Sequence, residues 1–200
     1  MGDTATPRER ARGHVSGLPD VRPDVRLRPW AAGDLPLLER LLGVPEMTEH
    51  IGGPEAPEQL RARHERYLHS AGKPGALFAV TVGGDGVAAG WVGYWETGWL
   101  GEKVWEAGWS VLPEFQGRGV ATSATVLLVE HARMAGGHAG MHAFPSVANV
   151  PSNAVCRKAG FTLLGEVDIE YPPGHPMRSN DWCIDTGAER PQRERERGPR

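Results

Sequence analysis

The stretch VWEAGWSVLPEFQGRGVATSATVLLVEHARMA, residues 104–135, decides the fold. Residues 104–111 are rich in Trp and Val and are soon followed by Pro113, which predicts a buried strand. Residues 120–135 have apolar positions at helical spacing. We therefore expect a strand followed by a helix, and the buried face of that helix is predicted to carry Val120, Ala124, Leu127, Leu128, His131 and Met134.

The turn between these two elements contains Gly117, Arg118 and Gly119. Glycines let backbone N–H groups point inward, and the start of a helix adds unpaired N–H groups and the positive end of its dipole. This combination favours a phosphorylated ligand, although a glycine-rich turn can also serve only as a connection. The turn lacks the Lys-Ser/Thr ending of a P-loop, and its glycine spacing does not match the dinucleotide fingerprint.

Gln116-x-x-Gly119-x-Ala121 resembles the pyrophosphate-binding loop of the GNAT N-acetyltransferase superfamily. A second similarity follows at the family's spacing, in the segment Asn149-x-x-Ser152-Asn153-Ala154-x-Cys156-x-Lys158-x-Gly160-Phe161. The resemblance covers roughly residues 25–186. It is nearest to the subgroup that acetylates the N-terminal amines of ribosomal proteins.

The resemblance implies that acetyl-CoA is the co-substrate. It implies that the backbone of Trp109, Ser110 and Val111 holds the pantetheine arm. The pyrophosphate would be bound by the loop and helix start, comprising Gln116, Gly117, Arg118, Gly119, Val120, Ala121 and Thr122. Asn149 and Asn153 suit the pantetheine amides, with helix capping as the alternative.

Glu106 is the candidate general base, because it is the only carboxylate within an otherwise apolar strand. The alternatives are a solvent-facing Glu, an ion pair, or a residue that orients the acceptor amine. Cys156 stands where much of the family has a Tyr that protonates the leaving thiolate. Ser152 matches a subgroup serine that hydrogen-bonds the sulfur, so it is the replacement acid we expect, unless it only satisfies N–H groups at the helix start. No His or Cys has metal-ligand spacing, and we expect no metal site.

The remaining pattern predicts an α+β fold: a GNAT-like mixed sheet of about seven strands with helices on both faces, splayed between the fourth and fifth strands. Asp34 is expected to cap a short helix that ends at Gly43. A second helix over 57–70 precedes a β-hairpin over 76–96. After the long helix come a strand over 140–144, a helix over 151–159 and strands over 161–171 and 181–185.

Length, charge and composition indicate how the chain is organised and which classes of protein are excluded. The chain has 200 residues and a net charge of −3, which argues against a general nucleic-acid binder. We expect a flexible leader over 1–23, the catalytic domain over 24–186 and a disordered charged tail over 187–200. No apolar run is long enough to span a membrane, and no secretory signal is evident, so we expect a cytoplasmic protein.

The function predicted from the sequence is acetyl transfer to a primary amine by direct attack in a ternary complex. The acceptor is left open between a protein N-terminus, an aminoglycoside-like antibiotic and another small amine, and the assembly between monomer and homodimer. Acceptor selection is expected near Trp95, Trp99, Tyr171 and the 172–180 loop. The alternative is an acyl-CoA-binding module that has lost catalysis.

Overall fold

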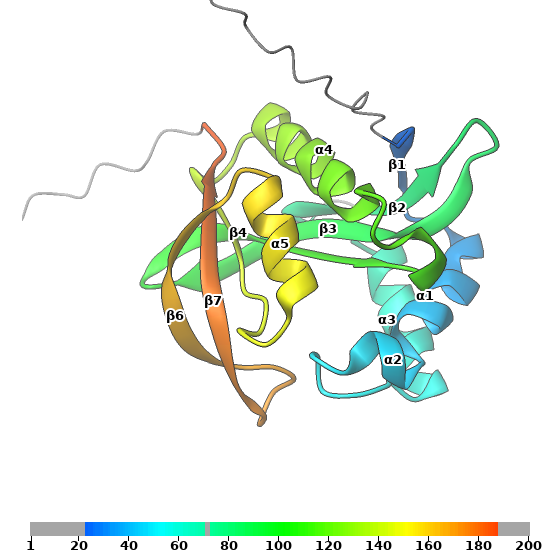
Figure 1. Ribbon diagram of the computed structural model, residues 1–200, viewed down its shortest axis with the longest axis horizontal. Coiled ribbons are helices and arrows are strands. Elements are labelled where there is room, and N and C mark those ends of the chain that lie inside the picture. Colours follow the sequence, from blue (N-terminus) through cyan, green and yellow to red (C-terminus); the bar gives the residue numbers. More distant parts are fainter. Residues whose placement is uncertain (1–22, 71–72, 188–200) are drawn as a thin grey trace, which may run out of the picture.

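The computed structural model describes residues 23–70 and 73–187, so the predictions for the leader and for residues 188–200 of the tail lie outside the described residues. Seven strands form one sheet (Figure 1). The strands are β1 (Val25–Pro29), β2 (Gly75–Val82), β3 (Val87–Trp99), β4 (Glu102–Val111), β5 (Gly140–Ala143), β6 (Thr162–Glu170) and β7 (Pro176–Asp185). The helices are α1 (Leu35–Leu42), α2 (Pro45–Thr48), α3 (Pro57–Leu68), α4 (Val120–Ala135) and α5 (Val150–Lys158). This is the α+β fold predicted from the sequence.

The sheet order is β1-β2-β3-β4-β5-β7-β6, and every neighbouring pair is antiparallel except β4 and β5. β3 and β4 are paired from Gly90–Val111 to Trp99–Glu102. β4 and β5, in contrast, are in register only at Trp105–Met141 and Glu106–His142. Beyond Glu106 the two strands separate, which confirms the predicted splay and leaves one edge of β4 without a partner strand.

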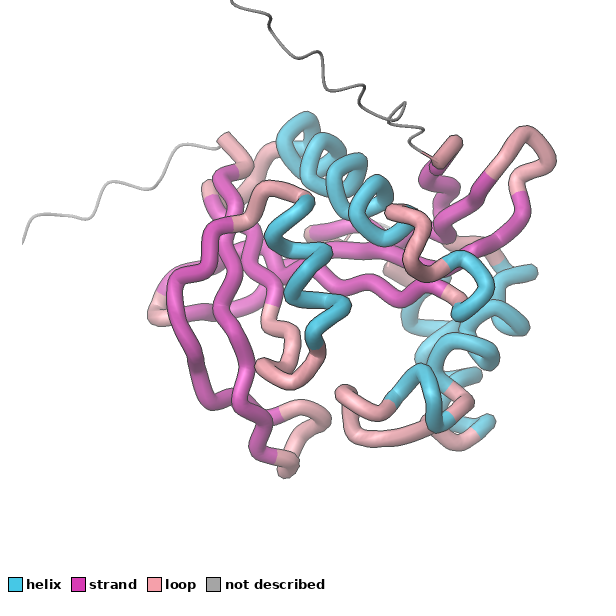
Figure 2. The backbone as a smooth tube through the Cα atoms, viewed as in Figure 1, coloured by secondary structure: helices cyan, strands magenta, loops and turns pink. Residues whose placement is uncertain are grey.

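The helices cover both faces of the sheet, as the tube view also shows (Figure 2). One core lies between the sheet and α4 with α5, and it includes Trp105, Ala107 and Met141. The other core lies between the sheet and α1 with α3, and it includes Trp91 and partly buried Trp95. Because successive strand residues point to opposite faces, Glu106 stands on the face of α1 and α3.

The buried face of α4 differs from the predicted one. Its fully covered residues are Val120, Ala124, Thr125, Leu128, Val129 and Ala132. Met134 is 82% exposed and Leu127 is only half-buried. Thr125 can be buried because its hydroxyl donates to the Ala121 carbonyl oxygen at 2.8 Å, which satisfies the polar group inside the helix.

Two further elements were misjudged from the sequence. β7 begins at Pro176, not at residue 181, so most of the expected 172–180 loop is strand. Arg178 in this part of β7 pairs with Glu166 and Asp168 of β6, and such charged positions lack the apolar alternation by which a strand is recognised. The short helix α2, which begins with Pro45, was not predicted.

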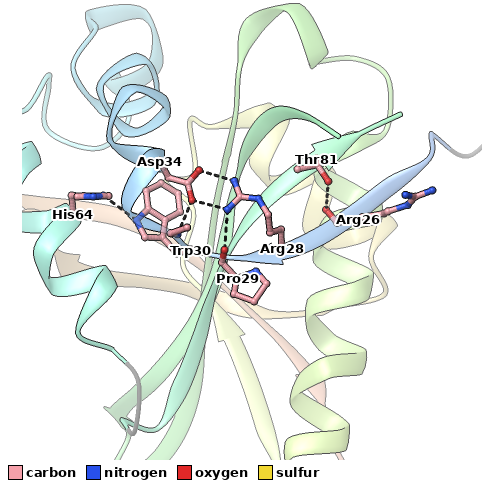
Figure 3. Close-up of polar contacts among 8 residues, drawn as sticks. Arg26, Arg28, Pro29, Trp30, Asp34, His64 and Thr81 are labelled. Carbon is pink, nitrogen blue, oxygen red and sulfur yellow. Dashed lines mark hydrogen bonds and ion pairs between the residues drawn. The ribbon is translucent and has the colours of Figure 1, made fainter. Parts of the chain in front are cut away.

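Asp34 precedes α1 as expected, but its carboxylate does not cap that helix (Figure 3). It accepts hydrogen bonds from the Ala31 N–H at 2.8 Å and from Arg28 at 2.6 and 3.0 Å. Nearby, the indole of Trp30 donates to His64 Nδ1 at 3.1 Å, as Figure 3 also shows. These contacts attach the connection after β1 to α3. Asp34 is a buried carboxylate with a paired cation.

Candidate active site

The turn before α4 presents a run of unpaired backbone N–H groups. Gly117 and Gly119 both have left-handed backbone, with φ of 71° and 79°, a region that favours glycine. The first backbone hydrogen bond of α4 runs from Ser123 N to Gly119 O at 2.9 Å. The N–H groups of residues 117–122 have no acceptor within the described part of the chain. Together with the positive end of the helix dipole, they form a site suited to an anion.

The two polar side chains of this turn act on the protein itself. Gln116 Nε2 donates to the Val111 carbonyl oxygen at 2.8 Å, which ties the turn to the end of β4. Arg118 is exposed and donates to the Glu114 carbonyl oxygen at 3.4 Å. The anion site therefore consists mainly of backbone groups, with Arg118 as an adjacent surface cation.

The open edge of β4 leads from the splay point to this turn. Leu112 N donates to Ala89 O at 2.8 Å, and bonded pairs alternate along an antiparallel ladder. The register therefore directs the N–H of Ser110 toward β3, and the N–H groups of Trp109 and Val111 toward the gap beside β5. An extended ligand lying in this gap can hydrogen-bond to Trp109 and Val111 as a further strand would. The Ser110 backbone N–H does not face that gap.

Glu106 stands where the gap begins. Its register partners are Trp95 on β3 and His142 on β5. Burial raises the pKa of the Glu106 carboxyl, and hydrogen bonds with the side chains of Trp95 and Thr97 lower it in part. An apolar environment of this kind makes a carboxylate a stronger proton acceptor than it is in water.

Apolar rings line the sheet next to Glu106. A Cβ placed on Gly108 would lie 2.9 Å from the Trp95 ring and 3.2 Å from the Trp91 ring, so both indoles extend over this glycine. Both rings lie on the same face of the sheet as Glu106. The absence of a side chain at position 108 is what lets the rings approach the strand.

The start of α5 carries the predicted asparagines and serine. Asn149 is the N-cap residue, and its side chain accepts from Ser152 N at 3.0 Å, so the capping alternative describes its geometry. The hydroxyl of Ser152 is half-buried and has no hydrogen-bond partner among the described residues. Ser152 does not cap the helix, and its hydroxyl is available to a ligand.

Asn153 makes four hydrogen bonds within the protein. Its Nδ2 donates to the carbonyl oxygens of Ser146 and Asn149, and its Oδ1 accepts from Asn180 and Trp182. Two donors and two lone pairs are all that a side-chain amide offers. The predicted contact with pantetheine would require Asn153 to exchange one of these partners.

Cys156 is fully buried, and burial raises the pKa of its thiol to about 12. A buried, neutral thiol in this core is a packing residue.

The histidines make hydrogen bonds but form no metal site. His131 contacts the Tyr94 hydroxyl at 3.1 Å, His138 contacts Glu96 at 2.9 Å and His142 contacts Asp181 at 2.7 Å. No group of three or more metal-ligating side chains is present within residues 23–70 and 73–187. The pairing of His142 with Asp181 was missed from the sequence, because no local pattern connects the two residues.

Two segments meet near the expected acceptor side. A Cβ on Gly52 would overlap the ring of Pro172, so the loop after α2 touches the turn between β6 and β7. Tyr171 in that turn is 40% exposed. Trp99, in contrast, is turned inward, and its indole donates to Asp181 at 3.0 Å. None of the helices in the described part of the chain is long and apolar enough to cross a membrane.

Comparison with solved structures gives the same architecture. A GNAT-family acetyltransferase from Bacillus anthracis has a TM-score of 0.68 at 18% identity, covering 82% of this chain and 95% of that one. Spermidine N-acetyltransferase from Vibrio cholerae, in complex with CoA and spermine, has a TM-score of 0.67 at 17% identity, covering 82% and 96%. An acetyltransferase from Salmonella typhimurium that modifies the N-terminal serine of ribosomal protein L7/L12 has a TM-score of 0.66 at 22% identity, covering 81% and 95%.

No curated protein matches in a sequence comparison. A family model described as acetyltransferase (GNAT) domain matches residues 24–162, well over half of the chain. This agrees with the strand order, the splay between β4 and β5 and the N–H groups before α4. The chain belongs to the GNAT acetyltransferase family.

Proposed function

We propose that this protein transfers the acetyl group of acetyl-CoA to a primary amine by direct attack within a ternary complex. The observation that carries the proposal is the run of unpaired N–H groups over residues 117–122, at the end of a strand edge that opens beside Glu106. Along the edge of β4, this arrangement offers first an anion site, then an extended channel and finally a proton acceptor. Acetyl-CoA has a pyrophosphate, an extended arm and a reactive thioester in the same order.

The cofactor is held mainly by backbone groups in this proposal. The N–H groups of residues 117–122 bind the pyrophosphate, with Arg118 as an adjacent cation. Trp109 and Val111 hydrogen-bond to the pantetheine arm along the open edge of β4. Because Ser110 directs both its N–H and its carbonyl oxygen toward β3, its contribution is limited to its side chain. Gln116 supports the site by holding the turn against Val111.

Glu106 takes the proton from the acceptor. An N-terminal amine has an ordinary pKa near 8 and an alkyl amine a pKa near 10.4, so most acceptor molecules arrive as ammonium. Only the neutral amine has a lone pair that can attack the thioester carbonyl carbon. A carboxylate in the apolar surroundings of Trp91 and Trp95 first attracts the ammonium group and then accepts its proton.

Ser152 protonates or hydrogen-bonds the departing thiolate. The proposal is supported by the hydroxyl of Ser152, which has no hydrogen-bond partner among the described residues, and by the burial of the Cys156 thiol at the family's usual acid position. Asn149 caps α5 and thereby fixes the backbone that carries Ser152. We keep Asn149 and Asn153 as proposed neighbours of the pantetheine arm, and only Asn153 must change partners to reach it.

The acceptor is a compact amine or a chain terminus that fits the wall formed by Trp91 and Trp95. One related structure is a complex with CoA and spermine, another related protein modifies an N-terminal serine, and both of these molecules carry amines. We propose a cytoplasmic location, where acetyl-CoA is available and where Cys156 and Cys183 remain thiols. A monomer or a homodimer is compatible with this proposal.

The test is an acetyl-CoA-dependent screen by mass spectrometry with spermine, kanamycin and serine-initiated peptides, extended to other primary amines. Acetyl transfer to any of them, lost in Glu106→Gln, supports the proposal. A protein that binds acetyl-CoA and acetylates none of these amines is the catalytically inactive binding module instead. Protein that fails to bind acetyl-CoA at all contradicts both functions.

A further inference from the structure

Two side chains of β3 reach the carboxyl group of Glu106 from the same side. Trp95 is the register partner of Glu106, and Thr97 lies two residues further along β3, opposite Val104. Because strand side chains alternate, Trp95, Thr97 and Glu106 all lie on the face of α1 and α3. The side chains of Trp95 and Thr97 both hydrogen-bond with the Glu106 carboxyl. The Glu106 side chain is therefore held against β3.

The position of the Trp95 ring agrees with this contact. The benzene end of the indole lies 2.9 Å from the place that a Cβ would take on Gly108, which is two residues after Glu106 on the same face. The ring therefore lies over β4, with its benzene end at Gly108 and its N–H close to Glu106. Because glycine has no side chain, the indole can approach the strand closely enough to donate to the carboxylate.

The two groups that hold Glu106 are uncharged. An ionised carboxylate only accepts hydrogen bonds, so the Trp95 indole N–H and the Thr97 hydroxyl are the donors. Another covered carboxylate, Asp34, is instead held by a cation, with Arg28 nitrogens at 2.6 and 3.0 Å. Among the described residues no Lys, Arg or His forms an ion pair with Glu106. An ionised Glu106 thus keeps its negative charge, and the protein supplies no cation to balance it.

The carboxylate still has acceptor capacity after these two bonds. Its two oxygens offer about four lone-pair positions, and Trp95 and Thr97 use two of them. Both donors come from β3, and on the other side β5 separates from β4 beyond Glu106. The unused positions therefore suit a cationic donor that enters from outside, such as the ammonium group of an acceptor.

We propose that Thr97 and Trp95 are positioning residues of the acetyl transfer, which hold the Glu106 carboxylate by its β3 side and leave its remaining lone pairs to the acceptor ammonium. The inference rests on the proposed function, because both residues act through the base assigned there. The ammonium proton passes to a Glu106 oxygen and later to solvent. The neutral nitrogen attacks the thioester carbon, so the C–N bond forms, the C–S bond breaks and the thiolate takes its own proton.

The two donors oppose the effect of burial on Glu106. Burial raises the pKa of the Glu106 carboxyl, and the hydrogen bonds with Trp95 and Thr97 lower it in part. Without one donor the carboxyl would keep its proton to higher pH, and a protonated carboxyl cannot take a proton from the acceptor. Loss of a donor should therefore move activity to higher pH, whereas damage to the fold should lower activity at every pH.

Other titratable groups lie on the same side of the molecule, and a change at Thr97 alters none of them. They include Glu102 on β4, His142 on β5, Asp181 and Cys183 on β7, Glu55 before α3, and Arg63, His64 and Tyr67 in α3. These groups are common to the unaltered protein and to each variant. A difference between the two pH profiles therefore reports on Glu106, and Glu106→Gln verifies that assignment.

Thr97→Val is the cleanest perturbation. Thr97 is half-buried in a strand, and valine has the same branched shape, so the change removes the hydroxyl donor alone. Thr97→Ser keeps a hydroxyl and is the conservative rescue, while Trp95→Phe removes the indole N–H and keeps an aromatic ring. Thr81→Val is the matched control on β2, because its hydroxyl donates at 3.4 Å to the Arg26 carbonyl oxygen and not to Glu106 (Figure 3).

The first measurement is the titration of the Glu106 carboxyl carbon by ¹³C NMR of the full chain, with Glu106→Gln used to assign the resonance. We expect Thr97→Val and Trp95→Phe to titrate at higher pH than the unaltered protein. Thr97→Ser and Thr81→Val should titrate as the unaltered protein does. If Glu106 titrates at the same pH in Thr97→Val and in the unaltered protein, the proposal is overturned without any knowledge of the acceptor.

The second measurement is the pH profile of kcat/KM with the amine that is acetylated fastest in the screen. Thr97→Val should lower kcat/KM about tenfold on the acidic limb and by less than about twofold on the high-pH plateau. Stabilisation by acetyl-CoA should stay unchanged, and in the Glu106→Gln background Thr97→Val should have no further effect on the profile. An equal loss at every pH overturns the inference. Failure of the proposed function is seen separately, as no transfer by the unaltered protein.

Discussion

Asn153→Ala should strongly destabilise the fold, because this side chain makes four hydrogen bonds, two of which connect α5 to β7. Asn153 is 7% exposed, and the Trp182 indole that donates to it at 2.8 Å belongs to a residue that is 5% exposed. The substitution leaves the Trp182 N–H buried without an acceptor, which costs about 1–3 kcal/mol. Each of the other three bonds contributes about 0.5–1.5 kcal/mol, and those groups regain water in part.

The expected loss is therefore about 2–4 kcal/mol in the free energy of unfolding. For a domain of this size it corresponds to a fall in Tm of roughly 4–16 °C, at about 2–4 °C per kcal/mol. Urea unfolding followed by circular dichroism measures the first quantity and calorimetry the second. Asn149→Ala is the matched control, since it removes only the capping bond to Ser152 N and should cost about 1 kcal/mol.

The same pair of variants separates a structural role from a cofactor role. If Asn153 only connects α5 and β7, acetyl-CoA should stabilise Asn153→Ala by as much as it stabilises the unaltered protein. A loss below about 1 kcal/mol would refute the hydrogen-bond reasoning. Unchanged stability with weakened acetyl-CoA binding would instead make Asn153 a contact of the pantetheine arm.

Four further outcomes are expected. Acetyl-CoA at a hundredfold excess over Kd should stabilise the protein by about 2.7 kcal/mol in thermal-shift measurements. Gly119→Glu should abolish this stabilisation, because it places a negative charge at the unpaired N–H groups. Normal acetyl-CoA binding by that variant would mean that the anion site is wrongly assigned. Glu106→Gln should lower kcat by about 10²–10⁴-fold near neutral pH, with partial recovery as pH rises, and near wild-type kcat across pH 6–9 would exclude the base. Burial raises the folded-state pKa of Glu106, so its ionisation opposes folding. Glu106→Gln should therefore be the more stable protein in urea at pH 7. The difference should shrink as pH falls through the raised pKa and be lost below the ordinary Glu pKa near 4.3, whereas a constant difference would contradict the raised pKa. Met134→Glu should change the free energy of unfolding by less than about 0.5 kcal/mol, while Leu128→Ala should lower it by about 2–5 kcal/mol. Similar losses in the two variants would mean that Met134 is buried, as the sequence pattern predicted.

The sequence pattern was sufficient for elements whose residues are close together in the chain. The strand over 104–111, the turn with Gly117 and Gly119, and α4 were all expected, because strand propensity, glycine conformation and helical spacing act over a few residues; β4 begins two residues earlier than predicted, at Glu102. The β4–β5 splay was expected only through the family resemblance. The carboxylate Glu106 was found because it interrupts an apolar strand, and the structure adds the burial that raises its pKa.

Local patterns failed where partners across the fold decide the outcome. Met134 has helical spacing, but the helix buries Thr125 and Ala132 instead, because these smaller side chains face the sheet. β7 is held by pairing with β6, and its charged outer positions hide the strand from any apolar alternation. Asp34 was a plausible helix cap, and the nearby Arg28 took its carboxylate instead.

The sequence by itself determined the order of the strands and of the longer helices, the glycine turn before α4 and the candidate base, since each depends on neighbouring residues. Only the tertiary structure decided which polar groups meet. Asn153 lies 29 positions from Trp182, His142 lies 39 positions from Asp181, and Trp99 lies 82 positions from the same carboxylate. Strand register sets these separations, and register is fixed by pairing and packing of the whole sheet. For this reason the proton-accepting surroundings of Glu106 became visible only in the folded chain.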